Sequence, residues 1–233
     1  MIDAGHGGIE RGAVGVGGIL EKEVALDVAK RVAEQLKAQG YDVAMTRDED
    51  ATLSLMTRSA KAASYQADLL VSVHANSSRS SDVQGIETYF PECCIEPMSH
   101  SYVQQLKSLV GYDDLHYIGV RSKNDQKLAY IAENIRKIKM ELSKKLAFNI
   151  HDQVLKTVQK HKGAIVDRKV RKGPFAVLVQ GTRPAVIVEV GYITSETEAS
   201  RLTDSSYCDI LARGIVNGIG AYVRAHTQKR KTA

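Results

Sequence analysis

Residues 184–193 read PAVIVEVGYI, an almost unbroken apolar run that predicts a strand buried on both faces of a sheet. Residues 69–73, LLVSV, have the same character, and segments with helical periodicity lie between such runs. Strands that alternate with helices are typical of α/β proteins. We therefore expect a single domain over residues 1–233, with a mostly parallel, twisted sheet flanked by helices on both faces.

Periodicity also predicts the other elements. Helices are expected where apolar residues recur at spacings of three and four, namely over residues 22–39, 55–66, 124–160 and 206–226. Short strands are expected over residues 1–3, 41–46 and 85–90. Residues 91–125 break the pattern with two prolines and a pair of cysteines. They predict an inserted loop that leads into the long amphipathic helix at 124–160.

The charge of the chain is uneven. The net charge is +5, but residues 1–100 contain nine basic and fifteen acidic side chains, whereas residues 101–172 contain sixteen basic and seven acidic ones. Most of this excess lies on or near the long helix, where it either solvates the outer face or attracts acidic groups of a partner. Only 6% of the residues are aromatic and none is Trp, so we expect no nucleic-acid binding.

Targeting signals and cysteines add little. No apolar run approaches the roughly 20 residues of a membrane span, and no basic-then-apolar leader opens the sequence. Cys93, Cys94 and Cys208 form neither a disulfide framework nor a zinc motif, which leaves their role open.

Three residues suggest a metal site. His6 follows the first strand within Gly5-His6-Gly7-Gly8, His74 ends another strand, and Glu21 opens the first long helix. Because the carboxyl ends of parallel strands meet at one edge of the sheet, the two histidines are expected to lie close together. Two imidazoles and a carboxylate suit Zn²⁺ and leave a position open for water. Taken singly, each residue also has a structural explanation, such as a packed histidine or a glutamate that complements the helix dipole.

Glu189 interrupts the apolar run at 184–193. Burying an unpaired carboxylate in such a strand costs on the order of several kcal/mol. One explanation is an ion pair with a nearby Arg or Lys. The other is a general base or acid beside the metal, with a pKa shifted towards neutrality.

Several motifs, taken together, resemble the zinc-dependent N-acetylmuramoyl-L-alanine amidase family (amidase type 3, the cell-wall and cell-division amidases). The resemblance follows the chain in order, except between Phe90 and Gly173. Its main segments are DAGHGG at 3–8, EKEVALDVA at 21–29, TRD at 46–48, ADLLVSVHAN at 67–76, GIETY at 85–89 and PAVIVEVGYI at 184–193.

The resemblance implies zinc ligands at His6, Glu21 and His74 and a catalytic glutamate at Glu189. It implies hydrolysis of the amide between N-acetylmuramic acid and L-alanine of peptidoglycan, for cell-wall remodelling or daughter-cell separation. The substrate in turn implies a periplasmic, secreted or cell-wall location, and we expect a monomer. Residues that match the family but are expected to support the fold or the ligands include Arg58 and Asn76.

Some division amidases of this family carry an inserted helix that blocks the zinc site until an activator protein displaces it. Residues 91–125 are similar in placement. One hypothesis is that an acidic side chain, Glu92 or Glu96, occupies the open zinc position at rest. The alternative is an ordered surface loop that lines the substrate groove.

Two other function classes remain as alternatives. A zinc carboxypeptidase or endopeptidase that acts on the stem peptide would use similar ligands, although the sequence contains neither HExxH nor HxxE. A peptidoglycan-binding module without catalysis is the second alternative. The presence of all four candidate residues argues against it, because a degenerate site is expected to lose at least one.

Overall fold

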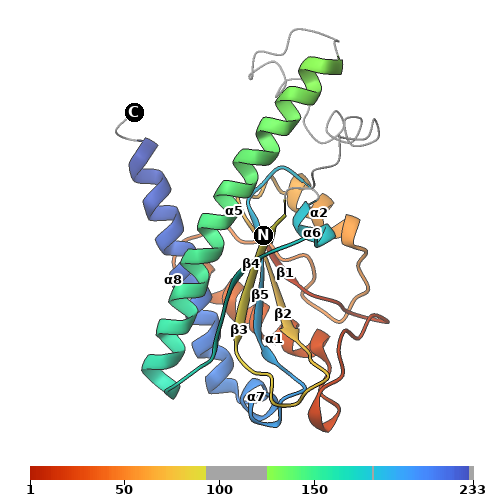
Figure 1. Ribbon diagram of the computed structural model, residues 1–233, viewed down its shortest axis with the longest axis vertical. Coiled ribbons are helices and arrows are strands. Elements are labelled where there is room, and N and C mark those ends of the chain that lie inside the picture. Colours follow the sequence, from red (N-terminus) through yellow and green to blue (C-terminus); the bar gives the residue numbers. More distant parts are fainter. Residues whose placement is uncertain (93–124, 180, 231–233) are drawn as a thin grey trace.

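The computed structural model describes residues 1–92, 125–179 and 181–230 (Figure 1). The strands are β1 Ile2–Ala4, β2 Leu70–Asn76, β3 Ile86–Pro91, β4 Asp167–Gly173 and β5 Ala185–Tyr192. The α-helices are α1 Glu21–Ala38, α2 Leu55–Ser64, α5 Asp125–Lys162, α6 Ala176–Val179, α7 Glu196–Leu202 and α8 Ser205–Arg230, and a 3-10 turn, η1, spans Val16–Gly18.

The described strands form one sheet in the order β1-β2-β5-β3-β4. β1, β2 and β5 are parallel, and β3 is parallel to β4, whereas β3 and β5 are antiparallel. The expected mostly parallel sheet is therefore confirmed, with a single reversal between β5 and β3. Every residue of β5 is buried, which explains its unbroken apolar sequence.

Helices cover both faces of the sheet, as expected, but unequally. α1, α5 and α8 pack over Val71, Val73, Val186 and Val188, and α5 and α8 run side by side (Figure 1). The short helices α2 and α6 contact each other on the opposite face, over Leu70 and other small or branched side chains. The face under α2 and α6 is therefore the more open one.

Several elements differ from the sequence-based expectations, among them the short helix α6 and the 3-10 turn η1, which were not predicted. Residues 41–46 form no strand, because β1 has only three residues and offers a single bridge, between Ile2 and Met45. The strand β4, DRKVRKG, was not predicted because its charged residues follow no apolar alternation. The short helix α7 was also missed. The long helix was predicted within two residues at each end.

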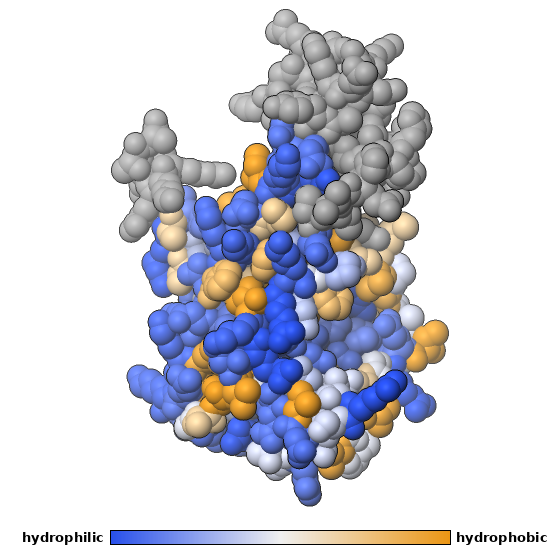
Figure 2. All heavy atoms as spheres, viewed as in Figure 1, coloured by the Kyte–Doolittle hydropathy of each residue, from blue (hydrophilic) through white to orange (hydrophobic). Residues whose placement is uncertain are grey.

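The side chains on the face shown in Figure 2 are largely hydrophilic. Among the helices that the structure describes, none is both long and apolar enough to cross a membrane.

Candidate metal centre and active site

The loop after β1 holds His6 in a constrained conformation. His6 has a φ of 56°, and Gly7 and Gly8 that follow have φ values of 130° and 58°. Positive φ is costly for residues with a side chain and is accepted by glycine, which explains the two glycines after His6. Two buried arginines fix the loop from below: Arg47 Nη2 donates to Gly5 O (2.7 Å) and Arg58 Nη2 donates to His6 O (2.6 Å).

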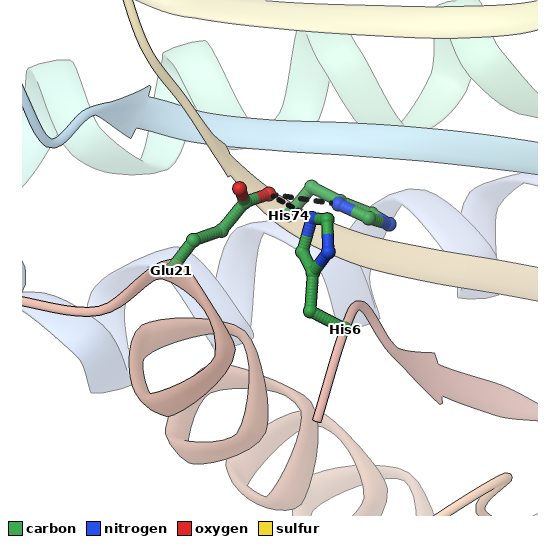
Figure 3. A group of neighbouring side chains, drawn as sticks. All are labelled: His6, Glu21 and His74. Carbon is green, nitrogen blue, oxygen red and sulfur yellow. Dashed lines mark hydrogen bonds and ion pairs between the residues drawn. The ribbon is translucent and has the colours of Figure 1, made fainter. Parts of the chain in front are cut away.

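Glu21, the first residue of α1, directs its carboxylate towards both histidines (Figure 3). Its Oε1 is 3.0 Å from His6 Nε2 and 2.9 Å from His74 Nδ1, and its Oε2 accepts a hydrogen bond from the backbone of Ala13 (2.9 Å). One ligand atom from each of the three side chains lies within 4.8 Å of the others. The structure thus brings together the three residues that were predicted to bind a metal.

Glycines allow this close approach. A Cβ at Gly5 would lie 2.5 Å from His74 Nε2, and a Cβ at Gly12 would lie 2.6 Å from Glu21 Oε2. Both distances are below van der Waals contact, so any larger residue would displace a member of the cluster.

The chemistry of the donors fits a divalent metal. Burial by itself would raise the pKa of Glu21, but hydrogen bonds from His6 and His74 outweigh burial and hold that pKa well below its usual range. Glu21 is therefore ionised, as a metal ligand must be. Glu10 Oε1 lies 2.7 Å from His6 Nδ1, which leaves Nε2 facing the cluster. A carboxylate on the outer nitrogen of a ligating histidine is the usual arrangement in zinc sites.

Glu189 lies next to this cluster. It is the backbone partner of His74 in the β2–β5 pair, so both side chains project from the same face of the sheet. The residue is 9% exposed, and its Oε2 accepts no hydrogen bond from any residue that the structure describes. Burial raises the pKa of Glu189 to about 7; the nearby His74 opposes this shift, and the Glu21 and Glu87 carboxylates add to it. A carboxyl group of this kind can both accept and donate a proton near neutral pH.

Comparison with known proteins identifies the family. The sequence pattern of the family described as N-acetylmuramoyl-L-alanine amidase matches residues 1–221. The chain belongs to this family. LytC of Bacillus subtilis, an N-acetylmuramoyl-L-alanine amidase, is 34% identical over 224 residues, which cover 96% of this chain and 35% of LytC. The chain thus spans about a third of that relative.

Solved structures of the family share the fold. AmiC2 of Nostoc punctiforme is 30% identical with a TM-score of 0.70, and the match covers 96% of this chain and 95% of AmiC2. The catalytic domain of CwlV from Bacillus (Paenibacillus) polymyxa var. colistinus is 29% identical with a TM-score of 0.71, covering 96% of both chains. The family and the fold expected from the sequence are confirmed.

The two residues expected to support the amidase site both lie beside it. Arg58 is buried and binds the carbonyl of His6. Asn76 is two residues beyond His74, and its Nδ2 donates to Glu87 Oε2 (3.3 Å). Their roles in supporting the site stay predictions.

Of the two acidic residues proposed to block the metal, the structure describes only Glu92, which lies away from the cluster. Glu92 is exposed and directly follows β3, where its backbone N–H donates to Gly173 O (3.1 Å). Glu92 lies five residues after Glu87 along the chain, which in a strand is a backbone span of about 17 Å. Glu92 would therefore reach the cluster only if the end of β3 moved. Glu96, like Cys93 and Cys94, lies outside the described residues, so the blocking role of both glutamates stays a prediction.

Sequence reasoning did not single out four residues around the site: Glu10, Arg47, Glu87 and Arg171. Arg47 and Glu87 belong to the segments that resemble the family, but nothing in their spacing marks them as neighbours of His6 or Glu189. Glu10 lies four residues after His6, a spacing that predicts a contact between side chains in a helix but not in an irregular loop. Arg171 comes from β4, which the sequence did not predict.

Proposed function

We propose that the chain is a zinc-dependent hydrolase that cleaves the amide between N-acetylmuramic acid and the L-alanine of peptidoglycan. The observation that carries the proposal is the placement of Glu189, buried and without a hydrogen-bond partner in the described structure, beside the cluster of His6, Glu21 and His74. Membership of an amidase family supports this choice of substrate.

In this mechanism His6, Glu21 and His74 hold Zn²⁺, which would acidify the attacking water and polarise the scissile carbonyl. Glu189 accepts the proton of the water as the water oxygen attacks the carbonyl carbon. It then donates that proton to the alanine nitrogen as the carbon–nitrogen bond breaks. The products are the lactyl carboxylate of the sugar and a stem peptide with a free amine. A carboxyl pKa near 7 suits a group that must do both.

Metal analysis combined with digestion of purified peptidoglycan, with and without chelator, tests the proposal. We expect about one zinc ion per chain and loss of hydrolysis with chelator. Glu189→Gln should lower turnover by about 10²- to 10⁴-fold and leave zinc bound. Glu34→Gln, an exposed change on α1, is the matched control. Near-normal turnover in Glu189→Gln would contradict the assigned role.

Product analysis separates the amidase from the alternatives. Release of intact stem peptide with an amino-terminal L-alanine supports the amidase. Fragments cut within the stem would instead indicate a carboxypeptidase or endopeptidase. Binding of peptidoglycan without any product would indicate a non-catalytic module.

Partners and location follow from the substrate. Peptidoglycan lies outside the cytoplasm, so we propose that the chain acts in the periplasm or the cell wall, as a monomer. We also propose that an activator protein acts on the insertion at 91–125. Deleting residues 92–122 should then raise peptidoglycan hydrolysis in the absence of any partner. Unchanged or lower activity would favour the alternative, a loop that lines the substrate groove.

A further inference from the structure

The edge strand β4 contains an irregularity that brings two arginines to the same face. Lys169 has a φ of 77°, and the register between β3 and β4 shifts at this point. Asp167 pairs with His151 of α5 (2.8 Å), and Val170 packs into the core on the α5 side. In a regular strand, residues 168 and 171 would project from opposite faces. The extra residue instead places the side chains of both on the face that carries Glu189.

Glu87 is the buried carboxylate that pairs with Arg171 of this strand. It is the backbone partner of Glu189 in the antiparallel β3–β5 pair, so it shares the face of the metal cluster. The residue is only 2% exposed. Its Oε2 accepts hydrogen bonds from Tyr192 (3.0 Å) and Asn76 (3.3 Å), and its Oε1 forms an ion pair with Arg171 Nε (2.7 Å). The Oε1 atom accepts no hydrogen bond from the described residues, so Glu87 holds one edge of the Arg171 guanidinium by charge attraction alone.

The terminal Nη atoms of Arg171 are available to bind a ligand. Its side chain is 53% exposed, and its Nε donates a hydrogen bond to the carbonyl of Arg168 (3.3 Å) while it lies in ion-pair contact with Glu87. Its terminal Nη atoms make no hydrogen bond with any residue in the described ranges. The guanidinium of Arg168 lies 5.1 Å from the centre of the Tyr192 ring. The two arginines are balanced by the carboxylates of Glu87, paired with Arg171, and Glu198, which lies near Arg168. The attraction for an anion therefore rests on the Nη donors of Arg171 that no described residue engages, because such donors form strong hydrogen bonds with a carboxylate.

We propose that Arg171, assisted by Arg168, binds a carboxylate of the stem peptide during hydrolysis. This inference rests on the proposed amidase function. Glu87 is two strands from His74, so the fixed edge of Arg171 lies about 10 Å from the metal cluster. An extended peptide covers that distance in about three residues. The free carboxylates of peptidoglycan are on the stem peptide, whereas the lactyl carboxyl of the sugar is consumed in the scissile amide.

Two synthetic muropeptides provide the test, one with all stem carboxylates free and one with all of them converted to carboxamides. The unmodified protein should hydrolyse the carboxylate form with a kcat/KM about 10- to 100-fold higher, the range expected for hydrogen bonds between charged groups. Arg171→Gln should remove most of that preference, mainly by raising KM for the carboxylate form. Its kcat/KM for the carboxamide form measures any loss that does not depend on the carboxylate, and the loss for the carboxylate form should be larger.

Two further variants separate recognition from folding and from bulk charge. Lys172→Gln removes one positive charge from the same strand; Lys172 is exposed, and its backbone partner Phe90 lies in the core on the α5 side. This variant should retain the preference. Arg171→Lys keeps a charge for Glu87 but loses the planar pair of Nη donors, so it should fold normally and show an intermediate preference.

Calorimetry with the Glu189→Gln variant measures muropeptide binding in a protein with little turnover. It therefore tests the subsite independently of catalysis. Tighter binding of the carboxylate muropeptide, lost when Arg171→Gln is added, supports the subsite even if no hydrolysis is seen. Failure to hydrolyse either muropeptide would count against the proposed function alone. Equal binding of the two forms, or no binding of either, would overturn the subsite. Equal effects of Arg171→Gln and Lys172→Gln would also overturn it.

Discussion

The buried ion pair between Asp3 and Arg58 should be a main support of the site, and Arg58→Met tests it. Asp3 is 1% exposed and Arg58 is 2% exposed, with 2.7 Å between Asp3 Oδ1 and Arg58 Nη1. Asp3 also accepts hydrogen bonds from Thr46 (2.6 Å) and Ser72 (2.5 Å). The variant would leave a buried carboxylate without its cation, and it would free the carbonyl of His6.

The magnitude follows from the cost of an unpaired buried charge. Removing one partner of such a pair costs about 3–5 kcal/mol of unfolding free energy. Changing both partners, Asp3→Asn with Arg58→Met, leaves no unpaired charge. The unfolding free energy of the double variant should therefore fall by less than the sum of the two single decreases. The difference, which is the coupling energy between the two residues, should be about 2–3 kcal/mol. Loss of the donor to His6 O should also weaken zinc binding in both variants that lack Arg58.

Urea denaturation of the two single variants and the double variant measures the coupling. Lys156→Met, which breaks an exposed ion pair with Asp152, is the control and should cost less than about 1 kcal/mol. A loss below about 1 kcal/mol in Arg58→Met would refute the reasoning. So would losses in the double variant that equal the sum of the single ones.

The ion pair between Asp3 and Arg58 also predicts how the free energy of unfolding changes at acidic pH. Burial alone would raise the pKa of Asp3, but Arg58, Ser72 and Thr46 together hold it below its usual value of 3.8. The stabilisation is therefore present above pH 4 and is lost as the pH falls through the folded-state pKa. The unmodified protein should lose stability more steeply below pH 4 than the double variant. Parallel curves would contradict the assignment.

Three further predictions concern the elements around the site. Glu10→Gln removes the carboxylate at His6 Nδ1 and should weaken zinc affinity by about 10- to 100-fold without changing the unfolding free energy, as measured by calorimetry and urea denaturation. Gly5→Ala should displace the ring of His74 and abolish zinc binding at micromolar metal, while circular dichroism shows a folded chain. His151→Phe removes hydrogen bonds that join α5 to β3 and β4 and should cost about 1–3 kcal/mol in urea denaturation.

The central strands and the residues of the candidate metal site could be predicted from sequence because their signals are local. β2 and β5 are buried on both faces, so apolar runs mark them directly. His6 sits among glycines that its strained loop requires, and His74 follows an apolar strand. Glu189 was recognisable because a charged residue in such a strand demands a partner or a function.

β4 could not be predicted in the same way, because its structure depends on distant residues. Its sequence alternates poorly and is mostly charged. It becomes a strand because the free edge of β3 supplies hydrogen-bond partners and because Asp167 is tied to His151 of α5. The irregularity at Lys169, which directs Arg168 and Arg171 to one face, leaves no periodic trace in the sequence.

The reversal of β3 decides which acidic residue reaches the active site. If β3 were parallel to β5, its last residues, next to Glu92, would lie at the metal edge of the sheet. Because β3 is antiparallel to β5, its second residue, Glu87, lies there instead. Glu87 forms an ion pair with Arg171 and so holds a cation in the neighbourhood of Glu189. A change in strand direction that no local pattern encodes thus places Glu87, and not the end of β3 next to Glu92, beside Glu189.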